Sequence, residues 1–153
     1  MKAEKIVSLL REKKLKITVA ESMTGGLIAK TLTDVPGASD VFEYGFIPYS
    51  DSAKQKILNV PENILQKYSA ISKETVASML EGAKHKSNAH VAVAVTGNAG
   101  GLEKKKGSVF IGIQVQNKVE IFEKDFFGTR DEIRKQTLDF ALQILLEKLK
   151  NGR

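Results

Sequence analysis

The chain has 153 residues, of which 42% are hydrophobic and 27% charged, and its net charge is +6 at pH 7. This length and balance are typical of one globular domain with a single core. The absence of cysteine excludes disulfides, cysteine-ligated metals and a thiol nucleophile. His85 and His90 are the only histidines, so the chain has few candidates for a Ser-His-Asp triad and serine chemistry would need another base.

The sequence gives little sign of a membrane or nucleic-acid partner. No apolar run reaches the roughly 18 residues that span a bilayer, and residues 1–5 lack the features of a signal peptide. We therefore expect a cytoplasmic location. The net charge favours an anionic partner, but the lysines are spread along the chain and no nucleic-acid module is recognisable. A small phosphorylated ligand would need only one or two of these cations.

The N-terminal part predicts a helix, a strand and a second helix. Residues 3–14 carry apolar side chains on one face, which is typical of an amphipathic helix. The β-branched run over residues 17–19 predicts a strand, and residues 27–32 have apolar residues at helical spacing. The turn between them, residues 20–26, contains two hydroxyl side chains and two glycines.

The turn over residues 20–26 is the first candidate for chemistry. Ser22 could attack a substrate, with the N–H groups at the helix start pointing into the crevice to stabilise an oxyanion. Gly25 and Gly26 would let a ligand approach the backbone, because they have no Cβ. Alternatively, Ser22 or Thr24 only caps the helix, as most such residues do. The turn does not match the G-x-S-x-G elbow.

The middle of the chain predicts a strand followed by three helices. Residues 41–49 are aromatic and β-branched, and Pro48 indicates an edge strand or the end of a strand. Short helices are expected over residues 50–58 and from Pro61. A longer helix follows Ser72, which is a favourable N-cap.

A second loop of small residues follows a strand that is apolar on both faces. Residues 91–95 predict this central strand, and residues 96–101, beginning with Thr96 and Gly97, form the loop at its carboxyl end. Open α/β sheets bind ligands in the crevice at the carboxyl ends of their strands. We therefore expect this loop and the Ser22 turn to face one site.

The C-terminal part predicts a connector, a hairpin and a helix. Residues 102–106 are a charged connector, and strands over residues 109–115 and 119–127 are joined by a tight turn. Thr129 and Glu132 form a capping box for the last helix. The order of elements predicts an α/β fold in one three-layer domain over the whole chain (1–153), with a mixed β-sheet covered by helices on both faces.

Three further side chains are candidates for the site. Arg130 begins the last helix, where the helix dipole disfavours a cation by a few tenths of a kcal/mol, so it could contact a bound phosphate or carboxylate. Alternatively, Arg130 is a surface arginine paired with a nearby carboxylate. Lys54, if buried, could act as general base on a serine, with the Tyr49 hydroxyl relaying or orienting the proton. Their alternative is a solvated lysine and an interface tyrosine.

Five segments in this order are similar to motifs of one family. Together they resemble the CinA C-terminal domain family, whose enzymatic members are nicotinamide-nucleotide amidases, and the resemblance covers nearly the whole chain. Each motif is weak alone, but five in register are specific. They are AESMTGG at 20–26, VPGAS at 35–39, YSDSAK at 49–54, AIS at 70–72 and TGNAG at 96–100.

The resemblance implies a serine amidohydrolase that converts nicotinamide mononucleotide to nicotinic acid mononucleotide and ammonia, without a metal or other cofactor. At the matching positions Ser22 would be the nucleophile, Lys54 its base and Tyr49 a supporting hydroxyl. Thr96 would bind substrate or assist the oxyanion, and Arg130 would contact the substrate. The other expected substrate-binding residues are Thr24, Gly25, Gly26 and Gly97. The resemblance also suggests a homo-oligomer and a stand-alone form of the domain.

The chain departs from the family pattern at several positions. The family usually has cysteine at Met23, asparagine at Asp51 and proline at Gly101, and residues 101–106 are shortened here. These changes remove no proposed chemical group, but the loop changes could alter closure over a substrate. The alternative function is therefore a non-catalytic protein that binds nucleotides or regulates competence or the response to DNA damage. Direct nucleic-acid binding would rest on charge alone.

Overall fold

The protein folds around one five-stranded sheet with strand order β2-β1-β3-β4-β5. The computed structural model describes residues 1–101 and 103–151. Leu102, the first residue of the expected connector, and Gly152 and Arg153 at the end of the expected domain lie outside the described residues.

The predicted order of helices and strands is confirmed. The helices are α1 (Lys2–Lys13), α2 (Leu27–Thr33), α3 (Asp51–Leu58), α4 (Glu62–Tyr68), α5 (Lys73–Ser87) and α6 (Arg130–Asn151), and the strands are β1 (Ile17–Glu21), β2 (Phe42–Phe46), β3 (Val91–Gly97), β4 (Lys105–Val115) and β5 (Lys118–Gly128). Within the described part of the chain, none of these helices is both long and apolar enough to cross a membrane.

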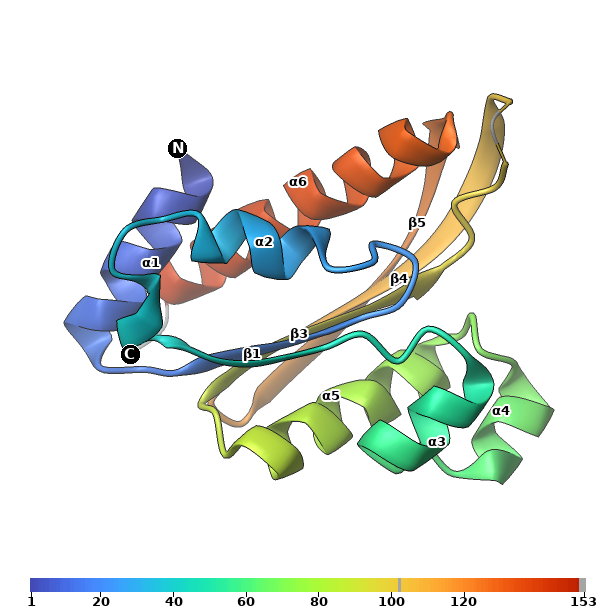
Figure 1. The fold of residues 1–153 in the computed structure, drawn as a ribbon, viewed down its shortest axis with the longest axis horizontal. Helices are drawn as coiled ribbons and strands as arrows, with labels where there is room; N and C mark the ends of the chain where they lie inside the picture. The colour runs from blue at the N-terminus through green and yellow to red at the C-terminus, as the bar shows by residue number, and fades with distance from the viewer. Residues whose placement is uncertain (102, 152–153) are drawn as a thin grey trace.

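The helices form a layer on each face of the sheet. Helices α1, α2 and α6 cover one face, and α3, α4 and α5 cover the other (Figure 1). On the first face α6 packs against α1 and β4, and on the second α5 packs against β3, β4 and α3. The expected α/β architecture with helices on both faces is therefore confirmed.

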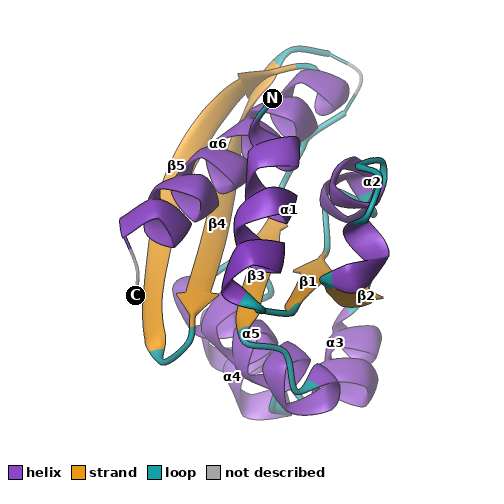
Figure 2. Cartoon of the chain, turned by 90° about the vertical axis from the view of Figure 1, so that its left-hand side faces the viewer, coloured by secondary structure: helices purple, strands orange, loops and turns teal. Residues whose placement is uncertain are grey.

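The sheet is mixed, and its parallel half brings the two predicted loops together. Strand β1 pairs in parallel with both β2 and β3, whereas β3, β4 and β5 are antiparallel neighbours (Figure 2). Glu21 at the end of β1 lies opposite Val95 near the end of β3. The turn after β1 and the loop after β3 therefore leave the same edge of the sheet, as expected from the strand order.

The core on the α5 side depends on glycines where elements approach closely. A Cβ on Gly82 of α5 would lie 2.1 Å from the carbonyl oxygen of Leu58, the last residue of α3. A Cβ on Gly112 of β4 would lie 2.6 Å from a methyl of Leu80. Helix α3 can therefore lie directly on α5, and this contact sets the position of the side chains that α3 carries.

Some element boundaries differ from the predictions. Strand β2 is an edge strand, as Pro48 indicated, but it ends at Phe46 because Pro48 has no N–H to continue a ladder. Strand β4 begins at Lys105, inside the predicted connector, because Lys105 pairs with Gly128 of β5. Charged side chains are compatible with this pairing, since residues 103–106 are exposed.

Candidate active site

Ser22 follows β1 directly and is held by the neighbouring central strand. Its N–H donates to the carbonyl oxygen of Val95 in β3 at 3.2 Å, and the residue is 7% exposed. The turn closes with a hydrogen bond from Gly25 N–H to the Ser22 carbonyl oxygen at 3.1 Å. Gly26 has φ of 105°, a conformation that favours glycine.

The capping alternative for Ser22 and Thr24 is wrong. The N-cap of α2 is Gly26, and the helix-start N–H groups that bond to a side chain bond to Glu21, not to Ser22 or Thr24. The Ser22 hydroxyl instead accepts a hydrogen bond from Lys54, and the Thr24 hydroxyl donates to the carboxylate of Glu21 at 2.6 Å.

The expected role of the α2 start is also wrong, because its N–H groups do not face an open crevice. Those of Ile28 and Ala29 donate to the two carboxylate oxygens of Glu21, each at 2.9 Å. Glu21 is fully buried at the end of β1. A carboxylate suits this place, since the orphan N–H groups of a helix start carry partial positive charge.

Lys54 reaches Ser22 from α3, which lies on the opposite face of the sheet from α2 (Figure 1). Ser50 caps α3 by accepting from the Ala53 N–H at 3.0 Å, which places Lys54 in the first turn. Its Nζ donates to the Ser22 Oγ at 3.3 Å and to the carbonyl oxygen of Tyr49 at 3.1 Å. The predicted Ser22–Lys54 contact is therefore present. The alternative of a solvated lysine is wrong, because Lys54 is 1% exposed.

Burial lowers the pKa of Lys54 below the usual value of 10.5, and the charge of Asp51 partly opposes this shift. The predicted direction is confirmed, but Arg130 is not among the causes. Among the described residues, no carboxylate forms an ion pair with Lys54. The amine is therefore easier to deprotonate than that of a surface lysine.

Tyr49 and Arg130 form a bridge beside this pair. The Tyr49 hydroxyl accepts from Arg130 at 2.6 Å, and a second Arg130 nitrogen donates to the carbonyl oxygen of Gly100. The Tyr49 hydroxyl thus contacts Arg130, and the group of Tyr49 that reaches Lys54 is its carbonyl oxygen. The alternative of an arginine paired with a carboxylate finds no support among the described ion pairs.

Thr96 and Gly97, the first two residues of the second loop, are held by contacts with other segments. The Thr96 hydroxyl donates to the carbonyl oxygen of Ala70 at 2.7 Å, which ties the segment before α5 to the end of β3. A Cβ on Gly97 would lie 2.7 Å from the carbonyl oxygen of Ser108 in β4. Close packing against β4 therefore requires glycine at this position.

Sequence reasoning missed two residues that support the Ser22 turn. One is Glu21, and the other is Arg134 of α6, whose Nε donates to the carbonyl oxygen of Met23 at 2.7 Å. An acidic residue ending a mostly apolar strand was an available signal for Glu21. The available signal for Arg134 was its position one turn after Arg130 on the same helix.

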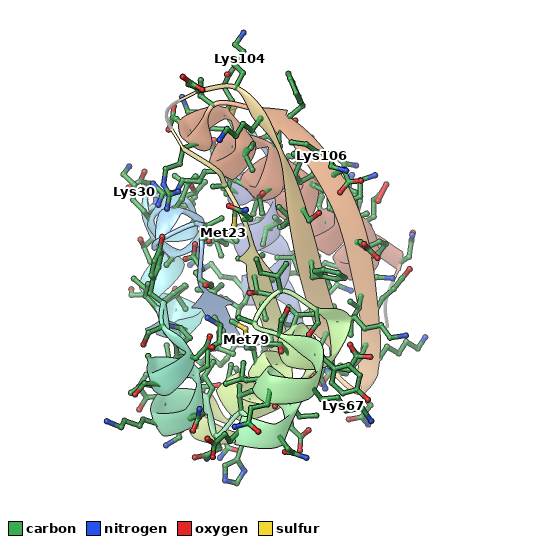
Figure 3. All side chains as sticks on the ribbon, turned by 90° about the vertical axis from the view of Figure 1, so that its right-hand side faces the viewer. Met23, Lys30, Lys67, Met79, Lys104 and Lys106 are labelled. Atoms are coloured by element: carbon green, nitrogen blue, oxygen red, sulfur yellow. The ribbon has the colours of Figure 1, made fainter. Side chains whose placement is uncertain are left out.

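Figure 3 shows where labelled side chains lie around the turn. Met23 lies near the arrowhead of β1, Lys30 projects at the side of the molecule, and Lys104 projects at the top of the picture. Lys30 forms an ion pair with Asp34. Two hollows in the surface lie elsewhere, one beside Leu15 and one beside Val119. Over the described residues, no group of histidine, aspartate or glutamate side chains could hold a metal ion.

The comparisons with known proteins agree on one family. The sequence profile of the CinA C-terminal domain matches residues 1–149. A relative from Caldicellulosiruptor bescii is 49% identical over 150 residues, which are 95% of this chain and 36% of that protein. A CinA-like protein from Endomicrobium trichonymphae is 46% identical over 145 residues, 92% of this chain and 34% of that protein. The chain thus spans about a third of the length of these curated relatives.

The similarity extends to solved structures. The competence/damage inducible protein CihA from Agrobacterium tumefaciens superposes with a TM-score of 0.88 at 36% identity, covering 97% of this chain and 93% of that one. With the profile match over residues 1–149, this agreement shows that the chain belongs to the CinA family through its C-terminal domain.

Proposed function

We propose that this protein is a serine amidohydrolase that converts nicotinamide mononucleotide to nicotinic acid mononucleotide and ammonia. The observation that carries the proposal is the buried Lys54 amine, 3.3 Å from the Ser22 hydroxyl. A lysine in the core without an ion-pair partner is costly to keep charged. It is therefore suited to take a proton from a neighbouring hydroxyl.

The first half of the reaction would form an acyl-enzyme. Neutral Lys54 accepts the Ser22 proton while Oγ attacks the carboxamide carbon of the nicotinamide ring, giving a tetrahedral oxyanion. Lys54 then returns the proton to the amide nitrogen as the C–N bond breaks. Ammonia leaves, and the nicotinoyl group remains on Ser22 as an ester.

The second half would regenerate the serine. Lys54, neutral again, takes a proton from a water molecule that attacks the ester carbonyl. Collapse of the second tetrahedral oxyanion breaks the bond to Ser22 Oγ, which recovers a proton from Lys54. The product is nicotinic acid mononucleotide, whose new carboxylic acid then loses its proton to solvent. The added water thus supplies one oxygen to the product, one proton to Ser22 and one proton to solvent.

Arg130 is the proposed contact for the substrate phosphate. Its guanidinium already donates to two neutral oxygens, on Tyr49 and Gly100. A phosphate would be a stronger acceptor, because hydrogen bonds between ions are shorter and stronger than bonds to neutral groups. Ser22 is only 7% exposed, so we expect the Arg130 bridge to rearrange when substrate enters.

A second candidate is a protein that binds the nucleotide without turning it over. The name of the Agrobacterium tumefaciens relative refers to competence and damage and not to amide hydrolysis. The two functions differ in a direct assay. A binding protein would retain nicotinamide mononucleotide in equilibrium dialysis and release no ammonia from it.

The deciding experiment measures ammonia release from nicotinamide mononucleotide by the purified protein and by the Ser22→Ala variant. The amidase proposal expects release by the wild type and almost none by the variant, with both proteins folded. Exposed Glu62, on α4, offers a control: Glu62→Gln should keep wild-type activity. Equal release by wild type and Ser22→Ala would exclude serine chemistry at this turn.

A further inference from the structure

Glu21 is a buried acidic residue that takes no part in the bond-forming or proton-transfer steps of the proposed reaction. It is fully buried, and within the described residues no cation pairs with it. Its carboxylate is satisfied by three donors: the Thr24 hydroxyl and the N–H groups of Ile28 and Ala29. All three donors lie in the turn after Ser22 or at the start of α2.

These bonds fix the turn from inside the core. Ser22 lies between Glu21 and Thr24 in the chain, and the side chains of these two residues are joined by a hydrogen bond. Ser22 is therefore part of a closed loop. Arg134 holds the same turn from α6 through the carbonyl oxygen of Met23. If one of these donors moved away, a buried carboxylate oxygen would lose a hydrogen bond, which costs free energy. The turn therefore has little freedom to change shape.

Three N–H groups of this turn, those of Met23, Thr24 and Gly26, have no acceptor among the described residues, and the first two directly follow Ser22. Met23 and Thr24 are each 3% exposed, and no described residue accepts from their backbone N–H groups. Buried residues whose N–H groups lack partners are rare in folded proteins. Because a peptide unit is planar and trans, the Arg134 bond to the Met23 carbonyl also fixes the opposite direction of the Thr24 N–H.

We propose that Glu21 is a positioning residue that presets the Met23 and Thr24 N–H groups as the oxyanion-binding donors. The proposal rests on the amidase function stated above, because it assigns the oxyanion of that reaction. Glu21 does not touch the substrate. It acts through Thr24 and the start of α2, holding the two donors where negative charge develops next to Ser22.

The first test is the change Glu21→Gln. The amide keeps the shape but presents an NH2 group to one of the three donors, so the turn loses a hydrogen bond and gains a repulsion. Oxyanion donors act mainly in the transition state. We expect kcat to fall about tenfold or more while KM stays within about threefold, since complete loss of one such donor costs about 10²–10³ in kcat.

Thr24 provides a milder variant in case Glu21→Gln does not fold. Thr24→Val removes only the hydroxyl that donates to Glu21, and Thr24→Ser keeps it. We expect kcat to fall in Thr24→Val and to be higher in Thr24→Ser than in Thr24→Val, because serine keeps the hydroxyl that donates to Glu21. A core change remote from the turn, Ile6→Val, should lower Tm and leave kcat unchanged. If Glu21→Gln and Thr24→Val both keep kcat within twofold of wild type when fully folded, the positioning role is wrong.

The second test does not require turnover. Pyridine-3-boronic acid would form a tetrahedral adduct with a reactive serine, and its binding can be followed by NMR of ¹⁵N-labelled protein. We expect the Met23 and Thr24 amide signals to shift on adduct formation, and Glu21→Gln to weaken binding about tenfold or more, in parallel with kcat. An adduct that leaves both amide signals unmoved, or no adduct at all, would overturn the assignment of these donors.

The two proposals can fail separately. If the wild type forms the boronate adduct with both amide shifts and Glu21→Gln binds the boronate about tenfold more weakly, but the wild type releases no ammonia from nicotinamide mononucleotide, the amidase function is refuted and the role of Glu21 is supported. A wild type that hydrolyses the nucleotide while Glu21→Gln retains full kcat and boronate affinity would refute the role of Glu21 alone.

Discussion

Asp51 begins the helix that carries Lys54, and its charge raises the Lys54 pKa that burial lowers. The two effects oppose each other, and burial is the larger. The balance matters because Lys54 could act as a base only in its neutral form. Asp51 takes no part in the Ser22–Lys54 hydrogen bond, but through its effect on the Lys54 pKa it should help to set the pH range of activity.

The first prediction concerns this pH range. The kcat/KM for nicotinamide mononucleotide should rise with pH as Lys54 loses its proton, and level off below the pH at which an ordinary lysine titrates. Asp51→Asn removes the charge that stabilises protonated Lys54, so the midpoint of the rise should move to lower pH. Asp34→Asn, a change at an exposed aspartate paired with Lys30, should leave the midpoint unchanged.

The same protonation should appear in the stability of the protein. The pKa of Lys54 is lower in the folded state, so the unfolded chain binds this proton more tightly. The free energy of unfolding should therefore rise with pH between the lowered pKa and about 10.5, relative to Lys54→Met measured in parallel by urea denaturation. Parallel curves for the two proteins across this window would contradict a lowered pKa.

A further prediction concerns the base itself. Lys54→Met keeps an unbranched apolar side chain in the core but removes the amine, and activity should fall by about 10²–10⁴-fold. The double variant Ser22→Ala with Lys54→Met should be hardly worse than either single variant, because residues that act as a unit are not additive. Wild-type activity in folded Lys54→Met would exclude the lysine as base.

The strand and helix order was predictable because each element carries a local signal. Ser72 and Thr129 accept from backbone N–H groups at the starts of α5 and α6, as their positions indicated. The apolar run of β3 predicted a central strand, which then placed two loops at one sheet edge. These inferences depend on hydrophobic pattern and helix capping, which act over a few residues.

The hydrogen bonds of the site were less predictable, because they join distant segments. Arg130 and Tyr49 are 81 residues apart, and Arg134 and Met23 are 111 residues apart. Glu21 is close in sequence to its partners, but only the folded turn shows that it occupies the N–H groups expected to face a ligand. Sequence patterns identified the residue types and not these pairings.

Another prediction tests whether Arg130 contacts the substrate phosphate. Arg130→Ala should weaken binding of nicotinamide mononucleotide by about ten- to a hundredfold, since a hydrogen bond to a charged group contributes about 1.5–3 kcal/mol. Binding of nicotinamide riboside, which lacks the phosphate, should change much less. Tyr49→Phe removes one of the two neutral acceptors of Arg130 and provides a control for disruption of the bridge. Equal losses for both ligands, measured by calorimetry, would show that Arg130 does not contact the phosphate.

The last prediction links core packing to the site. Gly82→Ala would place a Cβ 2.1 Å from the Leu58 carbonyl oxygen, so α3 or α5 must move. We expect a loss of about 1–3 kcal/mol in the free energy of unfolding, as for other overpacked cores. Activity should also fall, because displaced α3 carries Lys54 away from Ser22. Gly101→Ala is the matched control, since a Cβ there meets nothing within 4 Å. Urea denaturation and ammonia release should separate the two variants, and a stable, fully active Gly82→Ala would show that the position of α3 does not depend on this contact.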